Sequence, residues 1–175
     1  MISPRVNLVI ACLFSDKSVF ENVLEECTHI WGNVDYVSKS FVFDSTDYYA
    51  SEMGPGLYRC FLSFKVLITP EECLPIKHIC TDIEKKFSIS TNRTVNLDAG
   101  YIDTYKYVLF SYKEGGHKLF IGDGVWADMT LMYKKGTWYP FTWTFPDFKN
   151  DRYYRELITI REYYKIKLKE IAKFS

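Results

Sequence analysis

The chain has 175 residues, 22 basic and 22 acidic side chains and 47% hydrophobic residues. High apolar content without net charge excludes global disorder, and a neutral chain excludes nucleic-acid binding through a strongly basic field. A chain of this length can bury a sizeable core, so we expect one domain over residues 1–175.

The five cysteines are odd in number and form no C-x-x-C pair. This pattern favours reduced thiols and a cytoplasmic location over a disulfide framework or a zinc site. The apolar run at 6–14 is interpreted as a buried strand, because it is short for a signal peptide and Asn7 interrupts it. No stretch approaches the roughly 20 apolar residues that span a bilayer, so we expect no membrane association.

The first hundred residues alternate between strand and helix patterns. Strands are predicted at Val6–Phe14, Tyr36–Asp44, Leu57–Ile68 and Arg93–Asp98, and the segment 44–56 is predicted to be a loop. A helix capped by Ser15 or Asp16 follows the first strand. A capping box at Thr69–Glu72 begins the second helix, where Pro75 predicts a kink or a late start.

The order βαββαβ is that of a ferredoxin-like core, so we predict an α+β fold with this core in residues 1–100. Turn signals near Gly115, Gly122–Gly124 and Gly136 predict a β-meander, which an aromatic loop follows, over residues 101–148. A final helix is predicted in residues 149–175. No linker separates these parts.

The strand order predicts where polar residues gather. We expect strands one and three to run opposite to strands two and four. Asp44 and Asp98 would then end their strands at one edge, about 14 Å apart at about 4.8 Å per strand. Arg5 and Arg59 open strands at the same edge. This predicts a pocket with Asp98 in its floor, the segment 47–52 as its lid, and Arg5 or Arg59 as counter-charge.

Such a pocket has two interpretations. Neighbouring carboxylates can act as acid and base or bind a hard divalent cation, while tyrosine hydroxyls orient a polar ligand. Alternatively, the carboxylates cap loops and turns and the tyrosines only pack. No catalytic residue or metal ligand is assigned, and no cofactor is evident. The candidate ligand-binding residues are Asp44, Thr46, Asp47, Tyr48, Tyr49, Glu52, Arg59, Asn96, Asp98, Tyr101, His117, Asp123 and Trp143.

The candidates in the second half have structural alternatives. His117 fits a surface or hydrogen-bonded histidine, and Asp123 lies in a tight-turn sequence. Trp143 belongs to the aromatic loop 138–148, which can stack on a base or sugar, form a subunit contact, or seal the core. No P-loop, Rossmann or G-x-S-x-G motif is present.

Several blocks resemble a known family. These are Phe43-Asp44-Ser45-Thr46-Asp47-Tyr48-Tyr49, Glu52-Met53-Gly54, Phe61-Leu62-Ser63-Phe64, Val95-Asn96-Leu97-Asp98, Gly122-Asp123-Gly124 and Trp143-Thr144-x-Pro146-Asp147. In this order they resemble the bacterial family called domain of unknown function 4416, with Ala99 where that pattern has proline. The resemblance implies a stand-alone cytoplasmic protein and no established activity. Some members carry an automatic GTP-binding label, which would place base and phosphate at Asp98, the aromatic loop and Gly122–Gly124.

Three functions therefore stay open. The first is binding of a small polar ligand, with hydrolysis as its chemistry. The second is nucleotide (GTP) binding without a P-loop. The third is a non-catalytic module that forms homo-oligomers, such as a homodimer, through the meander edge or the aromatic loop.

Overall fold

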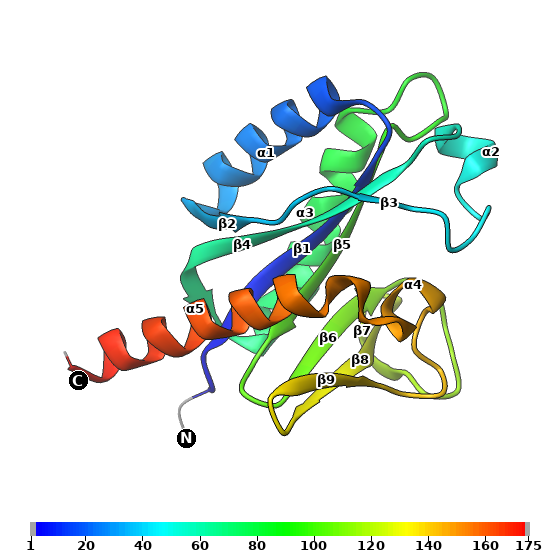
Figure 1. Cartoon of the computed structure of the whole chain (residues 1–175). Coiled ribbons are helices and arrows are strands. Elements are labelled where there is room, and N and C mark those ends of the chain that lie inside the picture. The colour runs from blue at the N-terminus through cyan, green and yellow to red at the C-terminus, as the bar shows by residue number, and fades with distance from the viewer. Residues whose placement is uncertain (1–2, 174–175) are drawn as a thin grey trace.

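In the computed structural model, which describes residues 3–173, nine strands form one antiparallel sheet (Figure 1). Their order is β2-β4-β1-β5-β6-β8-β7, with β3 paired to β4 and β9 paired to β8. The strands are β1 (Val6–Phe14), β2 (Val34–Val37), β3 (Phe41–Val42), β4 (Tyr58–Ile68), β5 (Val95–Ile102), β6 (Lys106–Ser111), β7 (Leu119–Gly122), β8 (Val125–Lys134) and β9 (Thr137–Pro140).

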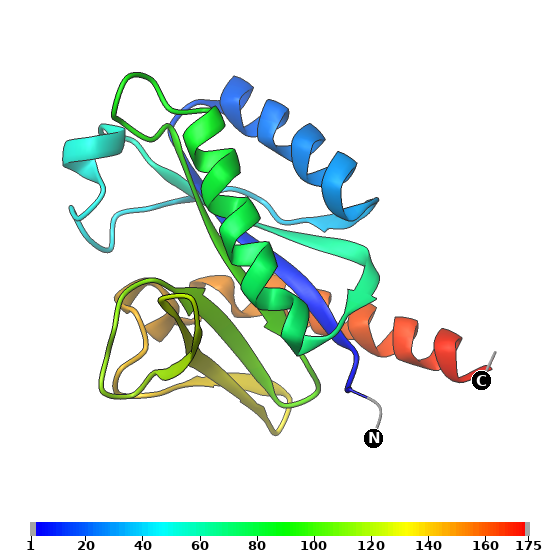
Figure 2. The same ribbon diagram turned by 180° about the vertical axis from the view of Figure 1, so that it is seen from behind.

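Helices cover both faces of this sheet, so the predicted α+β class is confirmed. The α-helices are α1 (Lys17–Trp31), α2 (Ala50–Met53), α3 (Cys73–Lys86), α4 (Pro146–Lys149) and α5 (Tyr154–Lys173), and short 3-10 turns are η1 (Pro70–Glu72) and η2 (Asp151–Tyr153). Figure 1 shows α5 in front of the sheet, and Figure 2 shows α1 and α3 on the opposite face.

Two helix starts follow the sequence closely. The Asp16 side chain accepts a hydrogen bond from the Ser18 amide at 2.7 Å and caps α1. Thr69 and Glu72 form the predicted capping box, but it starts the 3-10 turn η1, and α3 itself begins only at Cys73. Pro75 thus lies in the first turn of α3, where its missing N–H removes no helical hydrogen bond. The late start is confirmed.

The core has a separate apolar cluster on each face of the sheet. Alternate residues of β1 serve both clusters: Ile10 packs with residues of α1 and α3, whereas Val9 packs with residues of α5 such as Leu157. Every residue of β1 is buried, because helices cover both of its faces. This explains the uninterrupted apolar run that predicted the strand.

Strands β5 and β6 diverge after a short paired stretch, and we call the point where they separate the sheet fork. β5 pairs with β1 over its whole length, but it pairs with β6 only from Gly100 to Ile102. From there β6 follows β8 as far as Ser111. At the fork the strands come very close, because a Cβ on Gly100 would lie 2.4 Å from the backbone oxygen of Val108. Glycine is therefore required at this point.

The predicted strand directions are wrong. β1 is antiparallel to both β4 and β5, and β2 is antiparallel to β4, so β1 and β2 run the same way. The crossover through α1 returns the chain to the starting edge of the sheet, which makes this direction necessary. The first residues of β1 pair with the ends of β4 and β5. Arg5 therefore lies at the opposite edge from Arg59 and is not its partner in a pocket.

Two strand boundaries also differ from the prediction. The segment 36–44 is not one strand, because β2 ends at Val37 and β3 covers only Phe41 and Val42. Ser38 causes part of this break, since its hydroxyl accepts a hydrogen bond from the Phe61 amide. β5 continues to Ile102, so Asp98 lies in the middle of a strand rather than before a turn at Gly100.

Candidate functional site

A cleft of about 440 Å³ opens at the sheet fork. Its walls come from the segment 43–49, the start of β4, α3, β5, β6 and the segment 145–148. In β5, Val95 and Leu97 point into the core while Asn96 and Asp98 line the cleft, because successive side chains of a strand point to opposite faces. The aromatic side chains that line the cleft are Phe43, Tyr48, Tyr49, Phe110, Tyr112, Phe145 and Phe148.

A buried arginine joins two carboxylates in the cleft wall. Arg59 is 3% exposed; its Nη1 lies 3.0 Å from Asp98 Oδ2 and its Nη2 lies 3.5 Å from Asp147 Oδ2. The guanidinium also lies 5.2 Å from the centre of the Phe43 ring. Burial alone would lower the pKa of Arg59, but Asp147 and Asp98 outweigh it and raise the pKa. Arg59 therefore stays charged.

The two carboxylates respond to this arginine in opposite ways. Burial acts to raise the pKa of Asp98, but Arg59 and Lys77 outweigh it and the pKa is lowered. For Asp147 burial is the stronger effect, and its pKa is raised despite Arg59. Their environments therefore separate the two pKa values, an arrangement typical of acid and base pairs in active sites.

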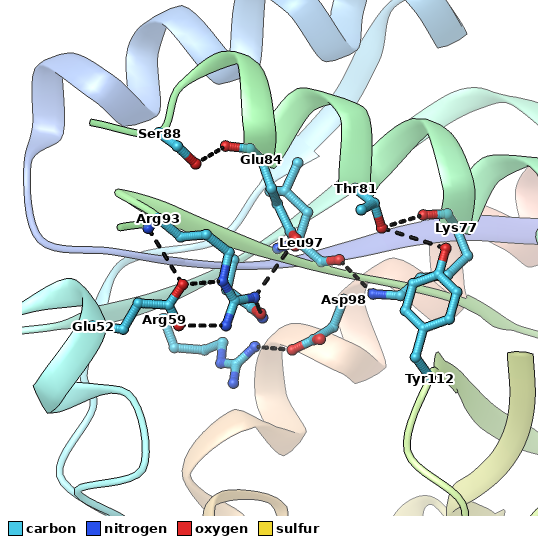
Figure 3. A network of polar contacts seen from close by, with 11 residues as sticks. Glu52, Arg59, Lys77, Thr81, Glu84, Ser88, Arg93, Leu97, Asp98 and Tyr112 are labelled. Atoms are coloured by element: carbon cyan, nitrogen blue, oxygen red, sulfur yellow. Dashed lines mark hydrogen bonds and ion pairs between the residues drawn. The ribbon is translucent and has the colours of Figure 1, made fainter. Parts of the chain in front are cut away.

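Where β5 has no neighbouring strand on the β6 side, helix α3 supplies the hydrogen bonds that such a strand would make (Figure 3). Beyond the fork, the backbone of Leu97 has no partner in β6. Glu84 Oε1 accepts from the Leu97 amide at 2.6 Å, and Lys77 Nζ donates to the Leu97 oxygen at 3.1 Å. Burial raises the pKa of Glu84, although Lys77 opposes this. These two side chains keep β5 and β6 apart without leaving Leu97 unpaired.

A second arginine fixes the segment that carries α2. Arg93 Nε and Nη2 donate to the two carboxylate oxygens of Glu52 at 2.7 and 2.8 Å, and Nη1 donates to Asn96 Oδ1 at 2.7 Å. Hydrogen bonding to Glu52 is the main cause of a raised Arg93 pKa. Arg93 thus connects α2 to the β5 wall of the cleft, as Figure 3 shows.

The β8 wall contributes a buried carboxylate. Asp128 is 1% exposed, and its Oδ2 lies 3.3 Å from His117 Nε2 and 3.9 Å from Lys118 Nζ. His117 in turn stacks on Trp143 with 5.5 Å between ring centres. Asp128 lines the cleft, whereas His117 and Trp143 do not.

Four buried side-chain atoms in this wall have no hydrogen-bond partner among the described residues. Arg59 Nε and Asn96 Nδ2 are donors, and Asp128 Oδ1 and Asp147 Oδ2 are acceptors. Each belongs to a residue that is at most 4% exposed and lines the cleft. Buried polar groups usually have a partner, so these four atoms are available to bond a water molecule or a ligand in the cleft.

The structure brings some candidates together and separates others. Thr46, Tyr48, Tyr49, Arg59, Asn96 and Asp98 line the cleft. Asp44 does not, since its carboxylate lies 2.7 Å from Arg152 Nη1 in η2. Glu52 reaches the cleft only through Arg93. The other candidates outside the lining are Asp47, Tyr101, His117, Asp123 and Trp143.

The candidate residues that do not line the cleft lie in other parts of the fold. Tyr101 lies in the part of β5 that pairs with β6, next to the core of the α1 and α3 face. Asp123 occupies the turn between β7 and β8 and lies 3.8 Å from His78 on α3. The aromatic loop is not uniform in burial, because Trp138 is buried in the core, Phe145 lines the cleft, and Trp143 is 40% exposed.

Sequence reasoning missed Lys77, Glu84, Asp128 and Asp147. For α3 a signal was available, because positions 77, 81 and 84 share a helix face beside the apolar stripe of Ile76 and Ile83. Asp147 follows Pro146 at the start of α4, in a block that was noted for its family pattern alone.

Two features are absent from the described residues 3–173. No group of three or more His, Cys, Asp or Glu side chains has the arrangement of a metal site in this part of the chain. No helix within it combines the length and apolar character of a membrane span.

The comparisons with known proteins give one match. The family model described as domain of unknown function (DUF4416) matches residues 4–164. The searches of curated proteins and of solved structures give no match. The family model covers both sides of the cleft, from β1 to most of α5. The chain therefore belongs to the DUF4416 family.

Proposed function

We propose that the chain binds a small polar ligand in the cleft at the sheet fork. The observation that carries this proposal is the set of buried atoms without a hydrogen-bond partner on Arg59, Asn96, Asp128 and Asp147, of which Asp147 Oδ2 has only its 3.5 Å ion pair with Arg59. Two are donors and two are acceptors, so a ligand that carries both kinds of group can satisfy them. The volume of about 440 Å³ is in the range of small-molecule sites.

The aromatic lining supports a ligand with a flat or apolar face. Tyr48 lies at the exposed end of this lining with 59% of its surface accessible, and Tyr49 packs edge-on against it at 4.9 Å between ring centres. Aromatic rings contribute contact area at little cost in side-chain entropy. The ligand would contact these rings and direct its polar groups to β5 and β8.

Hydrolysis is the chemistry that Arg59, Asp98 and Asp147 support best. The lowered pKa of Asp98 favours the carboxylate, which can accept a proton from an attacking water. The raised pKa of Asp147 favours the protonated acid, which can pass its proton to the leaving group. The bond to the leaving group breaks as the bond to the water oxygen forms, so the two products share the elements of water.

Thermal unfolding in the presence of a panel of sugars, amino acids and nucleotides tests the binding proposal. A ligand at a hundred times its dissociation constant stabilises the native state by about 2.7 kcal/mol, which raises the Tm by about 5–10 °C for a chain of this size. Tyr48→Ala should lower this shift without unfolding the protein, because the side chain is exposed. Tyr105→Ala is the matched control, since Tyr105 is 70% exposed and lies outside the cleft.

Two results would refute binding in the cleft. One is that no compound in the panel raises the Tm at about 10 mM. The other is that the Tm values of Tyr48→Ala and Tyr105→Ala respond alike to every stabilising compound. Asp98→Asn separates binding from hydrolysis, because it keeps the shape of the side chain but removes the proposed base.

Nucleotide binding is a second candidate, favoured by the charge at the cleft mouth. Lys85 and Lys113 are exposed and line the cleft, where they could meet phosphate while an aromatic ring stacks on the base. The same panel, run with and without magnesium, tests it. Stabilisation by GTP but not by guanosine would support the lysine contacts, and equal responses to both would contradict them.

Three broader interpretations stay proposals. The order β2-β4-β1-β5 and the two helices on one face support a ferredoxin-like core in the first hundred residues. Five free, buried cysteines support a reducing, cytoplasmic location. A divalent cation in the cleft stays a prediction from the carboxylates alone, which calorimetric titration with magnesium would test.

A further inference from the structure

The carboxylates of the cleft wall already have counter-charges in the chain. Each of the four that line the cleft lies 3.0 to 3.9 Å from a nitrogen of an arginine or lysine, and the pairs are Asp98 with Arg59, Asp147 with Arg59, Glu84 with Arg93, and Asp128 with Lys118. At the mouth, Lys85 Nζ lies 3.2 Å from Asp82 Oδ1, and Lys113 Nζ lies 3.5 Å from the centre of the Tyr48 ring. A charged ligand would therefore bring into the wall a charge that nothing there is left to neutralise, at a cost in desolvation.

The wall lacks hydrogen-bond partners rather than counter-charges. The four buried atoms that have no such partner among the described residues, which we call the free atoms, are Arg59 Nε, Asn96 Nδ2, Asp128 Oδ1 and Asp147 Oδ2. They belong to four elements, β4, β5, β8 and α4, and thus to different parts of the wall. A hydroxyl group has one donor and two acceptor lone pairs, so it can bond to either kind of free atom. A ligand with several hydroxyl groups around a ring suits this arrangement better than a planar base, whose polar groups lie in one plane.

Partly exposed aromatic rings lie beside these atoms. Tyr48, Tyr112 and Phe145 line the cleft and are 59%, 44% and 39% exposed, so part of each ring is open to a ligand. One face of a sugar ring consists of C–H groups, and burial of this apolar face against an aromatic ring is favourable. The cleft thus offers an apolar contact as well as donors and acceptors.

We propose that the ligand of the cleft is a neutral sugar, with its hydroxyl groups bonded to the free atoms and its C–H face against the aromatic rings. This inference rests on the proposed binding function and names the class of ligand. Nucleotides and free amino acids are charged, so the same site should bind them less tightly than it binds the sugar.

Glucose, galactose and mannose test the class of ligand, each beside its 2-amino and its uronic-acid analogue at pH 6. Thermal unfolding identifies the compounds that bind, and NMR titration of the isotope-labelled chain measures their dissociation constants. At least one neutral sugar should bind, and the dissociation constants of both its charged analogues should be higher by about tenfold or more. Charged analogues that bind as tightly as the neutral sugar would overturn the inference.

Asn96→Leu removes one of the free atoms. It should raise the dissociation constant of the neutral sugar by about fivefold or more, because a hydroxyl group loses its partner. Asn92→Leu is the matched control, since Asn92 is exposed and lies outside the cleft, and it should leave this constant unchanged. Equal effects of the two substitutions would overturn the inference. Saturation-transfer NMR on the wild type needs no variant: irradiation of the aromatic signals should saturate C–H protons of the bound sugar, and no transfer would overturn the inference too.

Failure of this inference is distinguishable from failure of the proposed function. If amino acids or nucleotides raise the Tm and none of the three sugars does, the ligand is not a neutral sugar, although the chain still binds a small polar ligand. If no compound of any class raises the Tm, both the inference and the proposed function are overturned.

Discussion

Replacing Arg59 by methionine tests how the cleft wall is held together. Methionine fills a similar length but removes the positive charge that lies against Asp98 and Asp147. Loss of one partner of a buried ion pair costs about 3–5 kcal/mol, because a charge is left in the protein without compensation. The Asp98 side chain is 25% exposed, so water compensates part of this loss. We expect Arg59→Met to lower the free energy of unfolding at pH 7 by about 3 kcal/mol.

The pH dependence of the free energy of unfolding shows whether the lost charge contact with Asp98 causes the destabilisation of Arg59→Met. In the wild type the lowered pKa of Asp98 contributes stability above the unfolded-state pKa of about 3.9, and this stability is lost only as the pH falls through the folded-state pKa. Without Arg59, burial is opposed only by Lys77 and the Asn96 side chain, so the pKa of Asp98 rises above its wild-type value. The folded variant then binds the proton more tightly than the folded wild type does. The variant should therefore recover stability relative to the wild type as the pH falls from 7 to 5.

Urea unfolding at pH 7 and pH 5 measures both quantities. Arg59→Lys is the control, because lysine keeps the positive charge and loses only the guanidinium's simultaneous contacts with Asp98 and Asp147. Its effect on the free energy of unfolding should be smaller and less dependent on pH. A difference below about 1 kcal/mol between Arg59→Met and wild type at pH 7 would refute this reasoning. So would a difference that stays constant between the two pH values.

Further substitutions test the sheet fork. Gly100→Ala should lower the free energy of unfolding by about 1–3 kcal/mol in urea, because its Cβ would meet the Val108 oxygen at 2.4 Å. Glu84→Ala should cost about 1–3 kcal/mol by leaving the Leu97 amide unpaired, whereas Glu84→Gln should cost less because its oxygen still accepts that hydrogen bond. Lys77→Met should unpair the Leu97 oxygen and accelerate amide hydrogen exchange in β5, as hydrogen-exchange mass spectrometry would show.

Local features of the fold were predictable from the sequence because neighbouring residues determine them. The capping box at Thr69 and the N-cap at Asp16 depend on side chains within three residues of the backbone groups that they bind. Alternation in β5 placed Asn96 and Asp98 on the face opposite Leu97 for the same reason. These predictions needed no knowledge of distant contacts.

The sheet fork could not be predicted in this way. It depends on β6 pairing with β8 where β5 continues alone, and on the approach of Gly100 to Val108. Arg59 and Asp147 are far apart in the sequence and meet only because β4 and α4 are both adjacent to the cleft. The wrong strand directions placed Asp44 and Asp98 at the same edge of the sheet in the prediction, about 14 Å apart, whereas Arg152 holds Asp44 outside the cleft.

The most direct measurement of the account is an NMR titration of the isotope-labelled chain with the compound that raises the Tm most. The account predicts shifts in amide signals that concentrate at residues 96–98 in β5, residues 111–113 at the end of β6 and Asp147 in α4, on both sides of the cleft. Shifts that concentrate instead on α1 or on the exposed side of α5 would place the ligand elsewhere and contradict the account.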